Sequence, residues 1–101
     1  MHKYIYLLIG SLLVGCTGLP TSGDYVTRGQ NYLKDGKKQK AVDCFNKAVS
    51  LNADNLDAYE GRGAAYFYNG QYELAIDDFG RVLQQDPYRI DTYTAYASAL
   101  V

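Results

Sequence analysis

The sequence predicts an all-α protein, an α-solenoid of about two and a half helical hairpins that follows a signal peptide and a short tether. Three observations favour this fold class. The chain repeats itself at an interval of 34 residues. Each repeat carries two apolar stripes with helical spacing. The chain also begins with a short basic and apolar segment that leads to a cysteine.

Residues 1–15 have the composition of a signal peptide. Three residues, Met1, His2 and Lys3, form a basic start, and residues 4–14 form an apolar run that Gly10 and Ser11 interrupt. A helix that crosses a bilayer needs about 20 apolar residues, so this run is too short to be a membrane anchor. We therefore expect residues 1–15 to be removed during export.

The apolar run ends in a motif, Leu13, Val14, Gly15 and Cys16, that resembles the lipobox of bacterial lipoproteins. The resemblance implies a lipid on Cys16, which would become the first residue of the mature protein. The residue after the cysteine is Thr17 and not an aspartate. In lipoproteins of this kind, the resemblance therefore further implies a position on the outer membrane, facing the periplasm. Two alternatives are a plain secretory signal with an incidental cysteine and a short helix of the fold.

Residues 16–23 are predicted to be the lipidated cysteine and a tether. Glycine, proline, serine and threonine dominate this stretch and nothing in it is periodic, which is typical of a loop. The repeat domain is expected over residues 24–101, with repeats at 22–55 and 56–89 and a terminal half repeat at 90–101. So short a tether would hold the domain at the membrane surface.

The second repeat shows why each unit is a helical hairpin. A first stripe has helical spacing, and a second stripe follows a turn in which Gly70 suits a left-handed helix stop. Small residues, Gly29 and Gly63 in the first helices and Ala41 and Ala75 in the second, are placed for close approach beside Phe45 and Phe79. The two stripes of the second repeat are Tyr59, Arg62, Gly63 and Tyr66, then Tyr72, Ala75, Ile76, Phe79, Val82 and Leu83.

These residues resemble the tetratricopeptide repeat, whose pattern is W-x2-L-G-x2-Y, A-x3-F and P within 34 residues. The resemblance covers residues 22–101 and implies a solenoid whose first helices line a concave face that binds an extended peptide or a helix. The chain departs from the pattern where tyrosine and arginine replace the tryptophan and leucine. We expect each arginine to pack its stem and expose its charge. The second repeat matches with Tyr59, Arg62, Gly63, Tyr66, Ala75, Phe79 and Pro87.

Composition narrows the chemistry that the mature chain can perform. The only histidine, His2, would leave with the signal peptide, which excludes catalysis by imidazole and histidine-dependent metal sites. With Cys16 lipidated, Cys44 alone remains, so we expect no disulfide within the chain, no metal site and no cofactor. A half-exposed helix position is expected for Cys44, and a thiol that forms an intermolecular crosslink is the alternative. About 80 residues leave no room for an enclosed active site. We predict that the protein is not an enzyme.

We expect most charged side chains to be exposed to solvent on the surface. Glu73, Asp77 and Asp78 are predicted to form an exposed acidic face rather than a catalytic pair. The first repeat carries six basic and four acidic residues, and the second carries three basic and six acidic ones. The lysines of segment 34–40 are read as a solvated turn or as a contact with anionic lipids. We expect no binding of nucleic acid.

A concave face is predicted beside the core stripe of the first helices. The lysine and asparagine clamp with which some relatives hold a terminal carboxylate is missing, and an apolar and aromatic floor takes its place. The alternative is that Phe67 and Tyr68 pack in the core. The predicted groove residues are Val26, Gln30, Leu33, Lys34, Glu60, Ala64, Phe67, Tyr68, Thr94, Ser98 and Val101.

The function predicted from these features is that of an adaptor without catalysis, which recruits cell-wall enzymes or assists pilus or secretion assembly. A structural protein that stacks end to end with itself is the alternative, and an enzyme ranks third. Within the last helix, we expect one stripe to face the second hairpin and the other, weakly polar face to support a homodimer. The alternative is a domain that is only marginally stable alone. The inward stripe is Ile90, Tyr93, Tyr96, Ala97 and Leu100, and the outer face is Thr92, Thr94, Ala95, Ser98 and Ala99.

Overall fold

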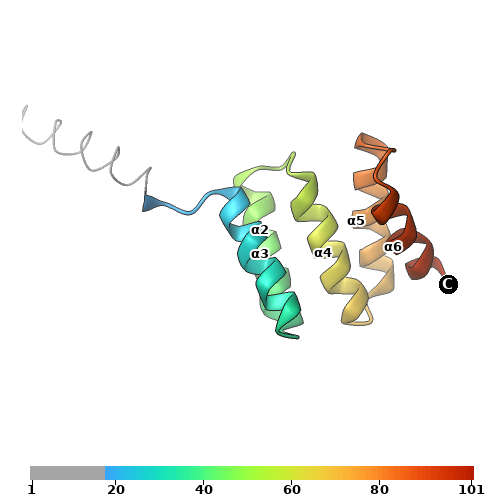
Figure 1. Ribbon diagram of the computed structural model, residues 1–101, viewed down its shortest axis with the longest axis horizontal. Coiled ribbons are helices and arrows are strands. Elements are labelled where there is room, and N and C mark those ends of the chain that lie inside the picture. Colours follow the sequence, from blue (N-terminus) through green and yellow to red (C-terminus); the bar gives the residue numbers. More distant parts are fainter. Residues whose placement is uncertain (1–17) are drawn as a thin grey trace, which may run out of the picture.

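The computed structural model describes residues 18–101, which form five α-helices and no strand (Figure 1). None of these helices is long and apolar enough to cross a membrane. The predicted signal peptide, the lipobox and Cys16 lie outside the described residues. The helices are α2 (Ser22–Lys34), α3 (Lys38–Leu51), α4 (Leu56–Tyr68), α5 (Tyr72–Gln85) and α6 (Ile90–Leu100). The predicted all-α fold of helical hairpins is confirmed.

Local sequence fixes where the helices begin and end. Thr21 caps α2 by accepting a hydrogen bond from the Asp24 amide, and the Asp24 carboxylate accepts one from the Thr21 amide. The helix therefore begins at Ser22, inside the segment predicted as tether. Asn55 caps α4 through a single bond, in which its side-chain Oδ1 accepts from the Ala58 amide. Gly70 has a φ of 78°, which confirms the left-handed stop after α4.

Glycine permits the closest approach between helices. The fully buried Phe45 ring of α3 lies against Gly29 of α2 and also against Gly61 of α4. A Cβ atom would stand 2.7 Å from the ring at Gly29 and 2.3 Å from it at Gly61. Phe79 of α5 packs on Gly63 in the same way. Phe45 thus joins its own hairpin to the next one.

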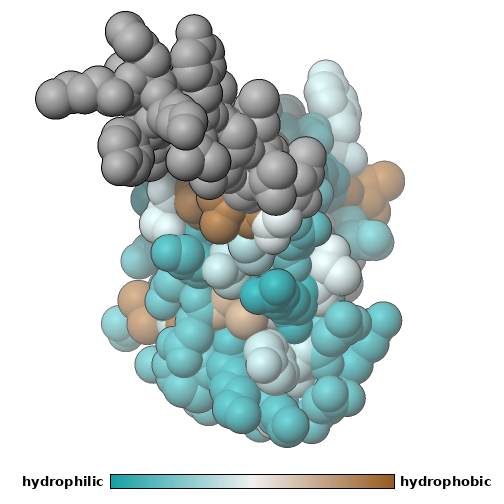
Figure 2. All heavy atoms as spheres, turned by 90° about the vertical axis from the view of Figure 1, so that its left-hand side faces the viewer, coloured by the Kyte–Doolittle hydropathy of each residue, from teal (hydrophilic) through white to brown (hydrophobic). Residues whose placement is uncertain are grey.

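The surface that surrounds this core is mostly polar. Figure 2 views the end of the solenoid at which the first hairpin lies, and hydrophilic side chains cover most of the face that it shows. The four lysines of segment 34–40 are exposed: Lys34 is the last residue of α2, Lys37 lies in the turn, and Lys38 and Lys40 lie in the first turn of α3. This exposure is compatible with both predictions for the segment, a solvated turn and a contact with anionic lipids.

The face of α6 that packs on the second hairpin is not the predicted one. Thr92 and Ala99 are buried, with exposed fractions of 1% and 7%, whereas Ile90 is 77% exposed. Tyr93 and Leu100 are also exposed. The prediction of which stripe faces inward is therefore wrong, although Tyr96 does pack against the core.

The 34-residue repeat explains this orientation. Thr92 corresponds to Ala58, which is fully buried and belongs to the face that α4 turns toward the preceding hairpin. Ala97 corresponds to Gly63, whose face is covered by Phe79 of α5. Because α6 is the last described helix, its equivalent face carries no following helix within residues 18–101.

A candidate binding groove between α4 and α6

Helix α4 lies between α2 and α6 and contacts both of them. A hollow of about 220 Å³ lies between α4 and α6. Five of the predicted groove residues line it, and Asp91, Ala95 and the buried Phe79 complete the lining. The five are Ala64, Phe67 and Tyr68 from α4, and Thr94 and Ser98 from α6.

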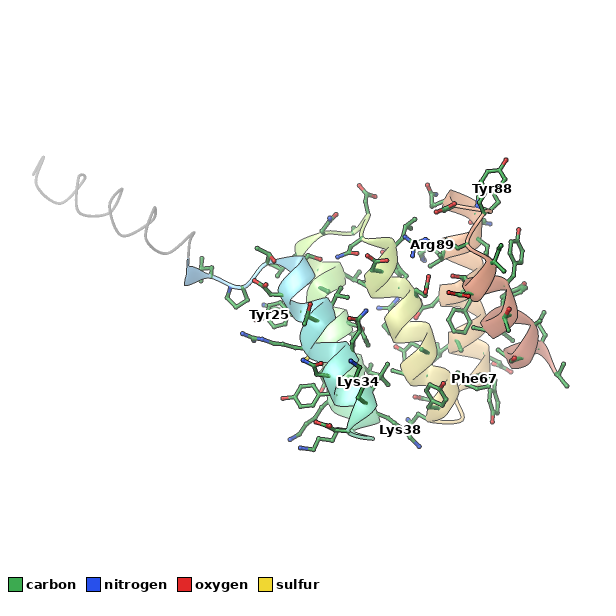
Figure 3. The ribbon with its side chains drawn as sticks, in the orientation of Figure 1. Tyr25, Lys34, Lys38, Phe67, Tyr88 and Arg89 are labelled. Carbon is green, nitrogen blue, oxygen red and sulfur yellow. The ribbon has the colours of Figure 1, made fainter. Side chains whose placement is uncertain are left out.

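Phe67 forms the apolar floor at one end of this groove (Figure 3). Its ring is half-buried and makes edge contacts with Tyr68 and Tyr72, each with ring centroids 5.5 Å apart. A second hollow of about 280 Å³ shares Phe67 and Ser98 with the first, and Val101 contributes to its wall. Tyr68 is 62% exposed, so this aromatic cluster is open to solvent.

The predicted groove residues of α2 do not share this hollow. Val26 is 7% exposed and lies in the core around Phe45, so its side chain is not on a binding face. Leu33 packs against the same core. Gln30 and Lys34 are exposed on α2. The hollow is therefore built by α4 and α6.

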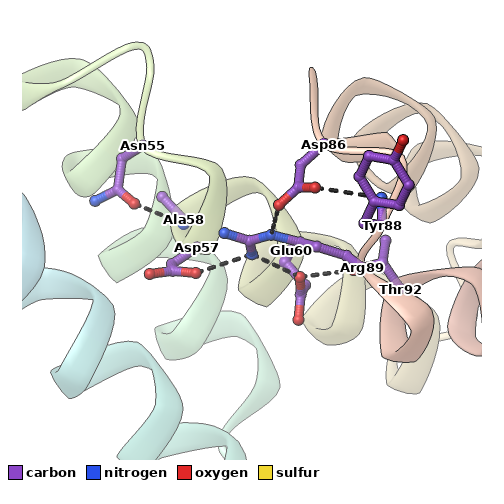
Figure 4. Close-up of polar contacts among 8 residues, drawn as sticks. All are labelled: Asn55, Asp57, Ala58, Glu60, Asp86, Tyr88, Arg89 and Thr92. Atoms are coloured by element: carbon purple, nitrogen blue, oxygen red, sulfur yellow. Dashed lines mark hydrogen bonds and ion pairs between the residues drawn. The ribbon is translucent and has the colours of Figure 1, made fainter. Parts of the chain in front are cut away.

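The predicted groove residue Glu60 does not line the hollow; it lies one helical turn before Ala64, in an ion-pair cluster near the amino ends of α4 and α6 (Figure 4). Arg89 Nη1 lies 2.9 Å from Glu60 Oε2 and 3.0 Å from Asp57 Oδ1, and Arg89 Nε lies 3.3 Å from Asp86 Oδ2. The Thr92 hydroxyl donates a further hydrogen bond of 2.7 Å to Glu60. The hydrogen bond to Glu60 has the largest effect on the pKa of Arg89, followed by the bond to Asp57, and both raise it. The guanidinium is therefore charged at every physiological pH.

Sequence reasoning missed this cluster and the place of Asp91 in the groove. Asp57 stands three residues before Glu60 and seven before Ala64, so helical spacing could have placed it on the same face of α4. The position of Arg89 offered no such clue, because it lies in the connection before α6 and reaches carboxylates 29 and 32 residues away.

The predicted acidic face on α5 is corrected by the structure. Asp77 is exposed, but Asp78 is only 4% exposed and forms a two-bond pair with Arg62, both bonds at 2.8 Å. Arg62 also donates to Asn46 Oδ1 at 2.9 Å, so its charge is paired inside the solenoid rather than directed to water. The hydrogen bond with Asp78 raises the pKa of Arg62.

Cys44 occupies the position in the first repeat that Asp78 has in the second. It is half-buried, and burial raises the pKa of its thiol. Within residues 18–101, no group of three or more potential ligands is arranged to hold a metal ion.

Comparisons with known proteins agree with the helical hairpins. Two family models described as tetratricopeptide repeats match residues 56–88 and 29–70. The second such domain of Spaghetti (RPAP3), solved with the HSP90 peptide SRMEEVD, has a TM-score of 0.75 and 22% identity, covering 78% of this chain and 73% of that chain. The protein TTC0263 of Thermus thermophilus has a TM-score of 0.72 and 24% identity, covering 85% of this chain and 44% of that chain. Comparison with curated proteins gives no match.

Proposed function

Because this chain carries tetratricopeptide repeats, we propose that it is an adaptor without catalysis that binds a peptide or helix of a partner protein between α4 and α6. The observation that carries the proposal is the hollow between these helices, with Phe67 as an apolar floor and the hydroxyls of Thr94 and Ser98 beside it. Phe67 would anchor an apolar side chain of the ligand. The Thr94 and Ser98 hydroxyls already donate to the carbonyls of Ile90 and Thr94, so their oxygens would accept hydrogen bonds from the ligand backbone. The bound peptide in the similar Spaghetti domain supports this mode of use.

The proposal places the adaptor on the periplasmic face of the outer membrane, held by a lipid on Cys16. The motif of residues 13–16 supports the anchor. Thr21 already caps α2, so the chain from Cys16 to Thr21 can span at most about 18 Å. The groove would then meet partners close to the membrane, among them cell-wall enzymes or the subunits of a pilus or secretion machine.

Site-specific crosslinking in intact cells tests the groove. A photoreactive residue at Ser98, which lies in the hollow, should trap a partner protein, whereas the same residue at Asp77, exposed on α5, should not. Adding Tyr68→Ala to the Ser98 probe should remove the adduct, because Tyr68 flanks the floor and is too exposed to support the core. Equal adducts from Ser98 and Asp77 would contradict the groove.

The anchor is tested by labelling cells with a fatty-acid probe. Cys16→Ser should abolish the label and release the protein from membranes, while Cys44→Ser, which removes the other cysteine, should leave both unchanged. A label that survives Cys16→Ser would refute lipidation at this residue.

Self-association through α6 is the second candidate function, and one observation favours it. The stripe of Ile90, Tyr93 and Leu100 is exposed on α6, at 77%, 47% and 57%. Another copy of the chain could cover these side chains and build a structural assembly. This stripe, and not the face of Thr92 and Ala99, would form the contact.

A further inference from the structure

The groove between α4 and α6 has two chemically different ends. On α4, Asp57, Glu60, Ala64 and Phe67 follow one another at intervals of three, four and three residues, which places them along one face. Figure 3 shows Arg89 near the amino ends of α4 and α6 and Phe67 near their opposite ends. The surface between α4 and α6 therefore continues from the aromatic end of the hollow, at Phe67, past Asp91 to the ion-pair cluster beyond its other end.

The ion-pair cluster carries an excess of negative charge. Three carboxylates, those of Asp57, Glu60 and Asp86, share the single guanidinium of Arg89. Asp91, which lines the hollow itself, adds a fourth carboxylate. The amino ends of α4 and α6 each contribute roughly half a positive charge, which leaves about −2 at this end of the groove.

Nothing else in the second half of the chain offsets this charge. Residues 56–101 contain no lysine and only three arginines. Arg62 is paired with Asp78, and Arg81 lies over the Tyr59 ring at 5.0 Å, away from the residues that line the hollow. The side chain of Asp57 is 66% exposed and that of Glu60 is 35% exposed, so a ligand can reach both.

We infer that the groove selects a basic ligand, a peptide segment with one apolar side chain on Phe67 and lysine or arginine directed toward Asp91, Glu60 and Asp57. This inference rests on the proposed function and adds the chemistry of the partner. Opposite charge raises the affinity and the association rate, and like charge excludes competitors. A segment that is acidic, as the HSP90 peptide SRMEEVD is near its end, would be repelled here.

The experiment is a selection from displayed peptides that share a fixed leucine–phenylalanine anchor and have randomised flanks. The full-length chain, purified as expressed, is held in phosphatidylcholine nanodiscs so that the lipid adds no net charge. Asp91→Asn removes one carboxylate from the groove, and Asp77→Asn removes one from the exposed surface of α5, so the two variants have the same net charge. Tyr68→Ala tests whether the selected peptides use the groove at all.

Wild-type protein and Asp77→Asn should enrich lysine and arginine over aspartate and glutamate in the flanks, and Asp91→Asn should weaken the best basic peptide about fivefold. An acidic selected pool, or equal losses in the two asparagine variants, would overturn the inference but leave the groove standing if Tyr68→Ala still abolishes recovery. A pool that Tyr68→Ala recovers unchanged, or the absence of any bound peptide, would refute the groove and the inference together.

Discussion

Replacing Gly61 by alanine should destabilise the domain, because this glycine touches an aromatic ring of the neighbouring hairpin. The added Cβ would lie 2.3 and 2.4 Å from the Cε1 and Cζ atoms of Phe45. The ring is fully buried and cannot retreat toward α2, where a Cβ at Gly29 would itself be only 2.7 Å away. Relief therefore requires α4 to move away from the first hairpin.

Two opposing terms set the size of the effect. Alanine favours a helix interior over glycine by about 1 kcal/mol. Overpacking a core costs about 1–3 kcal/mol, and the lack of space around Phe45 puts Gly61→Ala at or above the top of that range. The net loss in the free energy of unfolding should be about 2 kcal/mol, which for a domain of this size lowers Tm by roughly 8–16 °C.

Gly80→Ala is the matched control, since Gly80 also lies inside a helix, α5, but has space around it. The nearest atom to its added Cβ would be Cε1 of Tyr96 at 3.8 Å, an ordinary van der Waals contact. Helix propensity then acts alone and should raise Tm by roughly 4–8 °C. Thermal melts followed by circular dichroism measure both variants. If Gly61→Ala melts no lower than wild type, the close contact with Phe45 does not require a glycine at this position, and the reasoning is refuted.

Three further predictions follow from the described contacts. Asp78→Ala should cost about 2–3 kcal/mol in urea unfolding, because it leaves the Arg62 guanidinium unpaired in a half-buried place; an unchanged midpoint would contradict a structural role for the pair. Cys44→Asp should restore the equivalent pair with Arg28 in the first repeat and add about 0.5 kcal/mol, since Arg28 is exposed; a loss of stability would show that the two repeats are not equivalent there. Tyr93→Glu should abolish any concentration-dependent association in analytical ultracentrifugation while hardly shifting Tm, and a wild-type chain that is monomeric at every concentration would end the case for self-assembly.

The sequence by itself determined the helical hairpins and the partners within each hairpin. Turn chemistry and helical spacing act over a few residues, so Gly70 could be assigned its left-handed conformation directly. For the cap of α4 the sequence left Asp54 and Asn55 open, and the structure selects Asn55. The 34-residue period then paired Phe79 with Gly63, because the same combination of a large and a small residue returns in both repeats.

The groove was predicted in part. Helical spacing placed Ala64, Phe67 and Tyr68 on one face of α4, and the structure brings this face together with Thr94 and Ser98 of α6. The extension across α2 failed for Val26, because the same spacing is compatible with a core position when the neighbouring helix lies close.

Only the tertiary structure decided which face of α6 is buried and which charges are paired. The more apolar side chains of α6, Ile90, Tyr93 and Leu100, are the exposed ones, so hydrophobicity alone predicts the wrong orientation. The orientation depends on which side of α6 finds a neighbour, and the second hairpin covers Thr92 and Ala99. Arg89 finds its carboxylates across 29 and 32 residues of chain, a distance at which local patterns carry no information. The acidic end of the groove exists because the packing of α6 on α4 brings the connection before α6 beside the first turns of α4.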